Sequence, residues 1–190
     1  MRALLVATGA LLLAACGQSD AGSEAVNNAT GAEAGREKGS LASLLAAEPR
    51  FVALIRAAGM QPVLEGREPY TVLAPTGAAL DALPPGTLER LQQPAARAEL
   101  TGLLRRHILP GTVTQADLLA AVKGAGGTAT LASMAGDPLT VSQEGGALRI
   151  ADSNTSARLV GPESRASNGV IHRIDAVLPA PPTGTGSISD

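Results

Sequence analysis

Few residues of this 190-residue chain have side chains suited to chemistry, and their spacing does not favour it. His107 and His172 are the only histidines, and the chain offers no acidic or cysteine residues at the spacing typical of a metal site. Asp175 is the acid that would orient His172 in a hydrolytic triad. Its odd spacing along one strand puts the two side chains on opposite faces, and no serine lies in a nucleophile-elbow motif. We therefore expect hydrogen-bonded, structural histidines and no enzymatic activity, metal or cofactor.

Two other groups of residues have a functional and a structural interpretation. Thr71, Thr76 and Asp81 would make a polar binding cluster if they converged, but a threonine at 76 is typical of a helix cap and one at 71 of a strand. The glycines at 124, 126 and 127 are not followed by the Lys-Ser/Thr pair of a phosphate-binding loop. We expect the first group to be structural and the second to link a helix to a strand.

Composition excludes some classes of partner. The full chain has 15 basic and 17 acidic residues, a formal charge of -2, so it lacks the basic footprint of a nucleic-acid-binding protein. Phe51 and Tyr70 are the only aromatic residues, which leaves almost no platform on which bases or sugars could stack. A hydrophobic content of 45% is compatible with one folded domain.

Cys16 is the only cysteine and directly follows Leu13-Ala14-Ala15 at the end of an apolar run. That run, Ala3 to Leu13, is far shorter than the roughly 20 residues of a membrane-spanning helix. The pattern resembles a bacterial lipoprotein signal peptide over residues 1–15. It implies cleavage before Cys16, which then carries a diacylglyceryl group and an acyl chain such as palmitate. In a Gram-negative host, Gly17 favours the outer membrane, on its periplasmic or surface face.

The remaining chain divides by composition. Residues 16–40 contain the lipid-anchored cysteine and a tether rich in Gly, Ala, Ser, Asn and acids, which has too little apolar surface to fold. Residues 180–190, with prolines, glycines and serines, form a second flexible tail. The folded domain is therefore expected at 41–179.

Helices are predicted mainly in the first part of this domain. Ser40 caps a short helix, and Pro49 begins a second that Gly59 ends. An amphipathic helix starts at Pro94, and the spacing of Thr114 and Asp117 predicts a capping box at the start of another.

Strands are predicted at 70–74 and then mostly near the end of the domain, at 139–143, 147–151, 158–160 and 170–177. Glu144-Gly145-Gly146 suits a three-residue hairpin loop. Asn168-Gly169 suits a tight turn, since both residues tolerate positive φ. Helices first and strands mostly last indicate an α+β domain.

Three segments together resemble the fasciclin-like domain. Tyr70 to Leu80 is similar to the first signature box of that family, Leu103 to Gly111 to its leucine-rich helix ending in His and Pro-Gly, and Asn168 to Pro179 to its closing strand. The matching motif residues, expected to be mainly structural, are Thr71, Ala74, Pro75, Thr76, His107, Pro110, Gly111, Asn168, Gly169, His172 and Asp175. The resemblance implies a wedge of β-strands packed with several short helices, and a cell-surface adhesion module without catalysis.

The chain departs from the family pattern beside His107. Many members have Tyr where this chain has Arg106. Helical geometry rotates position 106 by about 100° from the apolar stripe, so its side chain is expected to meet solvent. Arg105 and Arg106 are therefore the candidate contact for an acidic partner or lipid head group. The alternative is a solvated helix end whose positive charges complement the C-terminal carbonyls.

The sequence thus predicts a lipid-anchored envelope module that binds a protein or matrix component noncovalently. An alternative is a carrier of an apolar small molecule in a crevice between helices and sheet. A further alternative is an envelope hydrolase, which would need a Ser/His/Asp geometry assembled by the fold.

Overall fold

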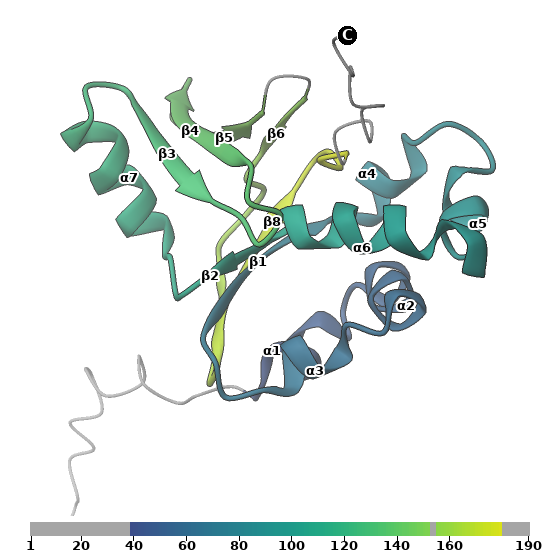
Figure 1. The fold of residues 1–190 in the computed structure, drawn as a ribbon. Helices are drawn as coiled ribbons and strands as arrows, with labels where there is room; N and C mark the ends of the chain where they lie inside the picture. The colour runs from purple at the N-terminus through teal and green to yellow at the C-terminus, as the bar shows by residue number, and fades with distance from the viewer. Residues whose placement is uncertain (1–38, 153–154, 180–190) are drawn as a thin grey trace, which may run out of the picture. The chain divides into compact units, whose positions relative to one another are not determined.

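The computed structural model describes residues 39–152 and 155–179, which form short helices and two β-sheets (Figure 1). Their order confirms the α+β class, because helices dominate up to residue 106 and strands dominate after it. Residues 1–15, Cys16, the tether up to residue 38 and the tail at 180–190 lie outside the described residues.

The first part of the domain contains most of the helices. They are α1 (Leu41–Leu45), α2 (Pro49–Ala58), α3 (Gln61–Glu65), α4 (Gly77–Asp81), α5 (Thr87–Leu91) and α6 (Arg97–Arg106), with strand β1 (Tyr70–Pro75) between α3 and α4. The predicted caps are confirmed: the Ser40 side chain accepts a hydrogen bond from the Ser43 amide, and Gly59 ends α2 at a φ of 73°. The helix predicted from Pro94 begins as a 3₁₀ turn and becomes α-helical at Arg97.

The second part is mostly strands. After α6 follow β2 (Ile108–Pro110), α7 (Gln115–Gly124), β3 (Thr128–Ala132), β4 (Pro138–Glu144), β5 (Ala147–Ala151), β6 (Ser156–Arg158), β7 (Ser164–Ala166) and β8 (Gly169–Ile174). The predicted capping box of α7 is present, because Thr114 and Asp117 each bond the other's backbone amide. Gly124, expected in the linker, is the last residue of α7, and Gly126 and Gly127 lead into β3.

The strands form two four-stranded sheets in the described part of the chain. The first has the order β2-β1-β8-β7, and its central pair β1 and β8 is parallel, with Tyr70 opposite Gly169 and Pro75 opposite Ile174. The second has the order β3-β4-β5-β6 and is antiparallel throughout. A bridge between Leu159 and Ile174 joins the two sheets where the chain leaves β6.

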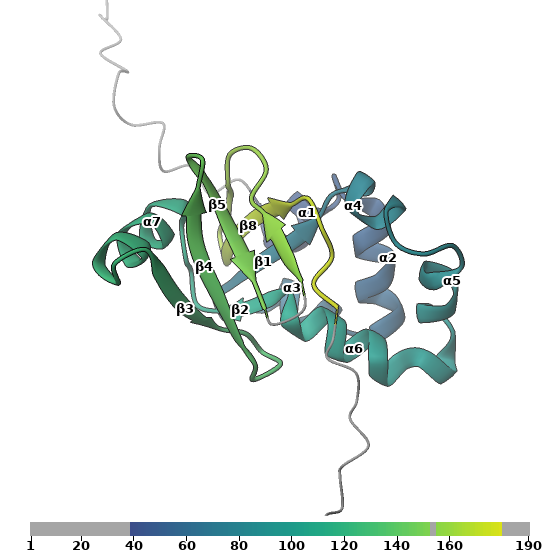
Figure 2. The same cartoon turned by 90° about the horizontal axis from the view of Figure 1, so that it is seen from above.

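The central strands of the first sheet, β1 and β8, are buried on both faces. Val72 and Ala74 of β1 belong to a core shared with α1, α2, α3 and α6, whereas Leu73 belongs to a second core formed with α7 and the second sheet. Figure 1 shows α1 to α3 and the second sheet on opposite sides of β1, and Figure 2 shows the second sheet lying over the β1–β8 pair. Alternation of side chains along β1 explains why its whole sequence is apolar or small.

Three details of the predicted sheet were wrong. Glu144 pairs with Ala147, so the hairpin loop has two residues, Gly145 and Gly146, both at positive φ. A two-residue loop with positive φ at both positions matches the right-handed twist of the flanking strands. The strand predicted at 158–160 lies at Ser156–Arg158, and the last strand ends at Ile174, not 177, because the chain there turns toward the second sheet.

Gly169 sets how closely β8 approaches β1. A Cβ at this position would lie 1.9 Å from the Tyr70 carbonyl oxygen, and the φ of 151° is rarely adopted by other residues. The backbone at Gly169 therefore requires a glycine, and the main cause is the close approach of the neighbouring strand. Asn168, by contrast, contributes through its side chain, as described below.

We expect Gly169→Ala to lower the free energy of unfolding by about 1–3 kcal/mol, because one of the two strands must shift to admit the methyl group. Gly77→Ala is the matched control, since a Cβ at Gly77 meets nothing within 4 Å. Urea denaturation of both variants measures the difference. Equal stability of the two would contradict the close approach.

Candidate functional site

The three motif segments meet in the first sheet, where β1 lies between β2 and β8. Thr71 is fully buried; its hydroxyl donates to the Gly111 carbonyl and accepts from the Val113 amide, both at 2.8 Å. It therefore fixes the turn that follows β2, in which Gly111 has a φ of 84°. Thr71 thus contacts backbone groups on both sides of this turn.

Asn168 joins three elements. Its side-chain oxygen accepts from the Leu41 amide at 2.8 Å, and its amide group donates to the carbonyls of Leu64 and Gly66 at 2.9 and 2.8 Å. These bonds tie α1 and the end of α3 to the start of β8. The sequence predicted a turn residue that tolerates positive φ, and the structure instead shows a cross-link made by the side chain.

The remaining residues of the first box are also used by the fold. Ala74 is buried in β1, Pro75 ends the strand, and the Thr76 hydroxyl caps α4 by accepting from the Ala79 amide at 3.2 Å. Asp81 forms an exposed ion pair with Arg50. The possible polar cluster of Thr71, Thr76 and Asp81 is thus divided among three separate contacts.

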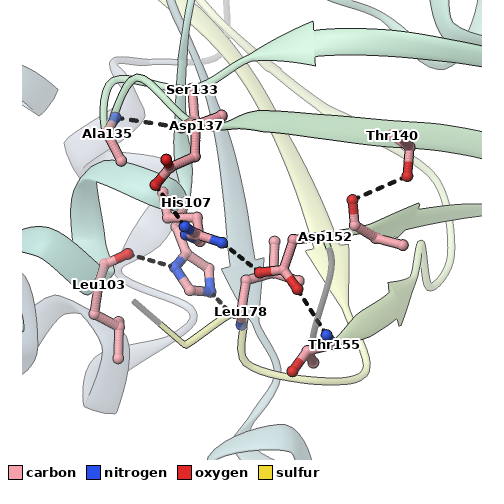
Figure 3. Close-up of polar contacts among 11 residues, drawn as sticks. Leu103, His107, Ser133, Ala135, Asp137, Thr140, Asp152, Thr155 and Leu178 are labelled. Carbon is pink, nitrogen blue, oxygen red and sulfur yellow. Dashed lines mark hydrogen bonds and ion pairs between the residues drawn. The ribbon is translucent and has the colours of Figure 1, made fainter. Parts of the chain in front are cut away.

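His107 is fully buried at the end of α6. Its Nδ1 donates to the Leu103 carbonyl at 2.9 Å, and its Nε2 accepts from the Leu178 amide at 3.1 Å (Figure 3). This pair of bonds requires the neutral tautomer with the proton on Nδ1. Burial lowers the pKa of His107 to about 4, so the ring is neutral at physiological pH and links α6 to the end of the chain's last described segment.

His172 lies on β8 and is almost fully buried. Its Nε2 donates to the Val113 carbonyl at 2.8 Å, and its Nδ1 has no hydrogen-bond partner among the described residues. Burial lowers the pKa of His172, although the nearby Glu163 carboxylate opposes this. Both histidines are therefore hydrogen-bonded to backbone groups within the fold.

Asp175 and His172 have different hydrogen-bond partners in the described residues. Asp175 accepts a hydrogen bond from the Arg158 amide at 2.7 Å, which places it in the link between the sheets and not beside the His172 ring. Among residues 39–152 and 155–179, no group of three or more His, Cys, Asp or Glu side chains is placed to hold a metal ion.

Arg106 is a correction to the sequence prediction. Its side chain is only 3% exposed and pairs with two carboxylates, Asp152 and, at 2.6 Å, Asp137. Asp152 is itself 4% exposed and also accepts from the Thr155 amide at 2.6 Å. Arg106 therefore cannot meet a partner from solvent.

The physical reason for this burial is a second packing surface on α6. The apolar stripe of the helix faces the first core, and the loops at one end of the β4–β5 hairpin close over the adjacent face. The sequence contained a usable signal. Asp137 precedes the first strand of the hairpin and Asp152 follows the second, so both acids lie at the open end of the hairpin. Two carboxylates close together there require a cation between them.

Arg105, the other half of the predicted contact, is exposed. It lies beside a shallow hollow along α6 that Arg97 and Thr101 also line. A larger crevice of about 830 Å³ lies between α5, α6 and the last described residues, with Leu91, Leu103 and Val177 among its apolar lining. Arg90 and Glu99, which are paired with each other, stand at this crevice.

We expect Arg106→Met to lower the free energy of unfolding by about 3–5 kcal/mol, because it leaves the buried Asp152 without its cation. Arg105→Met is the matched control on the neighbouring exposed position and should stay within about 0.5 kcal/mol of the parent. Arg106→Lys should be intermediate, since one ammonium group cannot match the fork of a guanidinium. Chemical denaturation tests all three. If both Met variants were equally stable, the buried pair would contribute nothing.

The lowered pKa of His107 predicts a pH dependence of stability. The unfolded chain takes up a proton near pH 6.5 and the folded chain only near pH 4, so stability is lost as pH falls through this window. Between pH 7.5 and pH 5 we expect a loss of about 2 kcal/mol, and His172 acts in the same direction. Denaturation at both pH values, with NMR of the imidazole nitrogens, measures it. Titration of the folded His107 near pH 6.5 would refute the assignment.

Comparison with known proteins agrees with this geometry. The Fasciclin domain family model matches residues 49–181. Two Synechocystis proteins are similar: sll1483, 35% identical over 69% of this chain and 66% of its own length, and sll1735, 32% identical over 73% of this chain and 96% of its own. Pig transforming growth factor-beta-induced protein ig-h3 is 32% identical over 75% of this chain, which spans 20% of that protein.

Among solved structures, a FAS1 domain pair from the insect cell adhesion molecule fasciclin I has the same fold. Its TM-score is 0.63 at 20% identity, covering 75% of this chain and 51% of that one. The fold that the three motif segments implied is therefore confirmed. Because the family model matches residues 49–181, which is most of the chain, this protein belongs to the fasciclin domain family.

Proposed function

We propose that the chain is a lipid-anchored module of the bacterial cell envelope that binds a protein or matrix partner noncovalently. The main support for the proposal is that the polar side chains of the motif form hydrogen bonds within the fold. Thr71, His107 and Asn168 form their hydrogen bonds inside the fold, and His172 bonds the Val113 carbonyl, which leaves recognition to the outer surface. A fasciclin domain pair in an insect cell adhesion molecule is a precedent for such binding.

The anchor is proposed from the sequence around Cys16. Each buried methylene of an acyl chain contributes about 0.8 kcal/mol, and several chains together hold a protein to a bilayer. Gly17 after the cysteine favours the outer membrane in a Gram-negative host. Over the part of the chain that the structure describes, no helix is both long and apolar enough to cross a membrane.

The contact surface is proposed on the exposed side of α6, around Arg105. The guanidinium of Arg105 lies beside the hollow lined by Arg97, and these positive groups suit an acidic partner surface. Arg106 has no part in this contact, because it is buried against Asp137 and Asp152.

A specific observation favours one alternative, the carrier of an apolar small molecule. The 830 Å³ crevice beside α5 and α6 is lined mostly by apolar side chains, and its charged pair Arg90–Glu99 is internally neutralised. This volume suits a small ligand. A near-ultraviolet or visible absorbance that copurifies with the protein would favour this carrier over the adhesion module.

One crosslinking experiment on intact envelopes tests both parts of the proposal. Cys16→Ser should abolish palmitate labelling and detergent partitioning without affecting the domain, because it removes the acylation site. Arg105→Glu should keep the label but capture less partner, more so at low salt, where the lost attraction is less screened.

Gly77→Ala, which adds a methyl group in open space, is the control for both readouts. A Cys16→Ser protein that still carried lipid would disprove the anchor. Unchanged partner capture by Arg105→Glu at low ionic strength would place the contact surface elsewhere.

A further inference from the structure

The edges of the second sheet differ in how they are protected. In the described part of the chain β6 carries Arg158, and its continuation at Leu159 pairs with Ile174, so that edge is closed by the first sheet. β3, at the opposite edge, is five residues long and contains neither a charge nor a proline. Charges and prolines are the usual devices that keep an edge strand from pairing with another chain.

The edges of the first sheet are also protected. β2 ends in Pro110, and its Ile108 carbonyl accepts a hydrogen bond from the Met134 amide. β7 is only three residues long and carries Arg165 at its centre. Among the described edge strands, β3 is therefore the one with no such device.

The outer side of β3 has unused hydrogen-bonding capacity. Its ladder runs from Thr128–Ser142 to Ala132–Pro138 on the β4 side, so alternate backbone groups point the other way. No described residue forms a hydrogen bond to these groups. A strand that pairs on one side only is a template for another strand.

Charge does not oppose the approach of a second copy at this edge. Residues 124–136, between Lys123 and Asp137, contain no charged side chain. Residues 39–179 as a whole contain 12 basic and 12 acidic residues, so two copies of the folded domain have no net repulsion.

We propose that β3 pairs with β3 of a second copy, antiparallel about a twofold axis, to join two four-stranded sheets into one of eight strands. A twofold axis makes the same strand pair with itself in the antiparallel direction. Centring the pair on Thr130 gives five residue pairs, with Thr130 opposite Thr130, Thr128 opposite Ala132, and Ala129 opposite Leu131.

This register keeps each face of the sheet consistent. Thr128, Thr130 and Ala132 are exposed, whereas Ala129 and Leu131 are half-buried against the second core. A shift by one residue would place Leu131 opposite an exposed position, and a shift by two would leave fewer residue pairs. Alternation and strand length together therefore select the centred register. The side chains that meet are small or hydroxylated, and paired threonines are favourable across strands.

The dimer is expected to be weak and dependent on concentration, because one five-residue strand pair buries less than the roughly 1,200 Å² of a standard interface. Its existence does not rest on the lipid anchor or on the contact proposed at Arg105. The β3 edge is neutral and self-complementary, and it therefore favours a second copy of this chain over a different extended polypeptide.

The test uses the full-length chain with Cys16→Ser, so that lipid plays no part. Sedimentation velocity from about 1 μM to about 1 mM should show a monomer passing to a dimer. Thr130→Lys and Thr130→Glu should each raise the dimer dissociation constant roughly tenfold, because like charges then meet at the axis. An equimolar mixture of the two variants should dimerise again, since Lys then lies opposite Glu.

Thr140→Lys is the matched control, because Thr140 is exposed and pairs with Thr130 from the inner strand β4. It should dimerise nearly as well as the parent. Circular dichroism melting checks that every variant is folded. A parent that stays monomeric to 1 mM would overturn the proposal, as would a mixture of the Lys and Glu variants that fails to dimerise. The proposal would also be overturned if the β3 amides were protected from hydrogen exchange only when a different polypeptide was added, and not by a second copy of this chain.

Discussion

The parallel pairing of β1 with β8 is the constraint on which the rest of the domain depends. These strands are nearly 100 residues apart in the sequence, and together they separate two cores, one with the N-terminal helices and one with the second sheet. Gly169 permits the close approach, and Asn168 holds α1 and α3 against the start of β8. Because a parallel pair in the middle of a sheet is buried on both faces, neither strand can expose polar groups without breaking a core.

This burial explains why the most conspicuous polar residues of the chain are structural. A hydroxyl, an amide or an imidazole placed between two cores must find a hydrogen-bond partner within the protein, because leaving it unpaired costs about 1–3 kcal/mol. Thr71, His107 and Asn168 meet this requirement by bonding backbone groups at the ends of neighbouring elements. Their side chains thereby fix the positions of loops. Recognition of other molecules is left to surfaces that the cores do not constrain, such as the exposed side of α6 and the edge of β3.

The ion pairs of Arg106 show how the two layers are joined. The helix α6 belongs to the first core, while Asp137 and Asp152 belong to loops of the second sheet. A buried ion pair contributes little net stability when it replaces apolar packing, but it strongly disfavours separation of its two sides once it is formed. The guanidinium therefore acts as a specific connection between α6 and the β4–β5 hairpin. As a result, Arg105 is exposed to solvent and Arg106 is buried.

Local features of the fold were determined by the sequence alone. Ser40, Pro49, Gly59 and the Thr114–Asp117 box mark helix ends, because caps depend on interactions within a few residues. The three motif segments likewise predicted the family and the structural use of the histidines. The tertiary structure decided the rest: the burial of Arg106, the side-chain role of Asn168, the short strands β2 and β7, and the open edge of β3. Each of these depends on which distant segments pack together, and helical or strand periodicity reports only that a face is buried, not what lies against it.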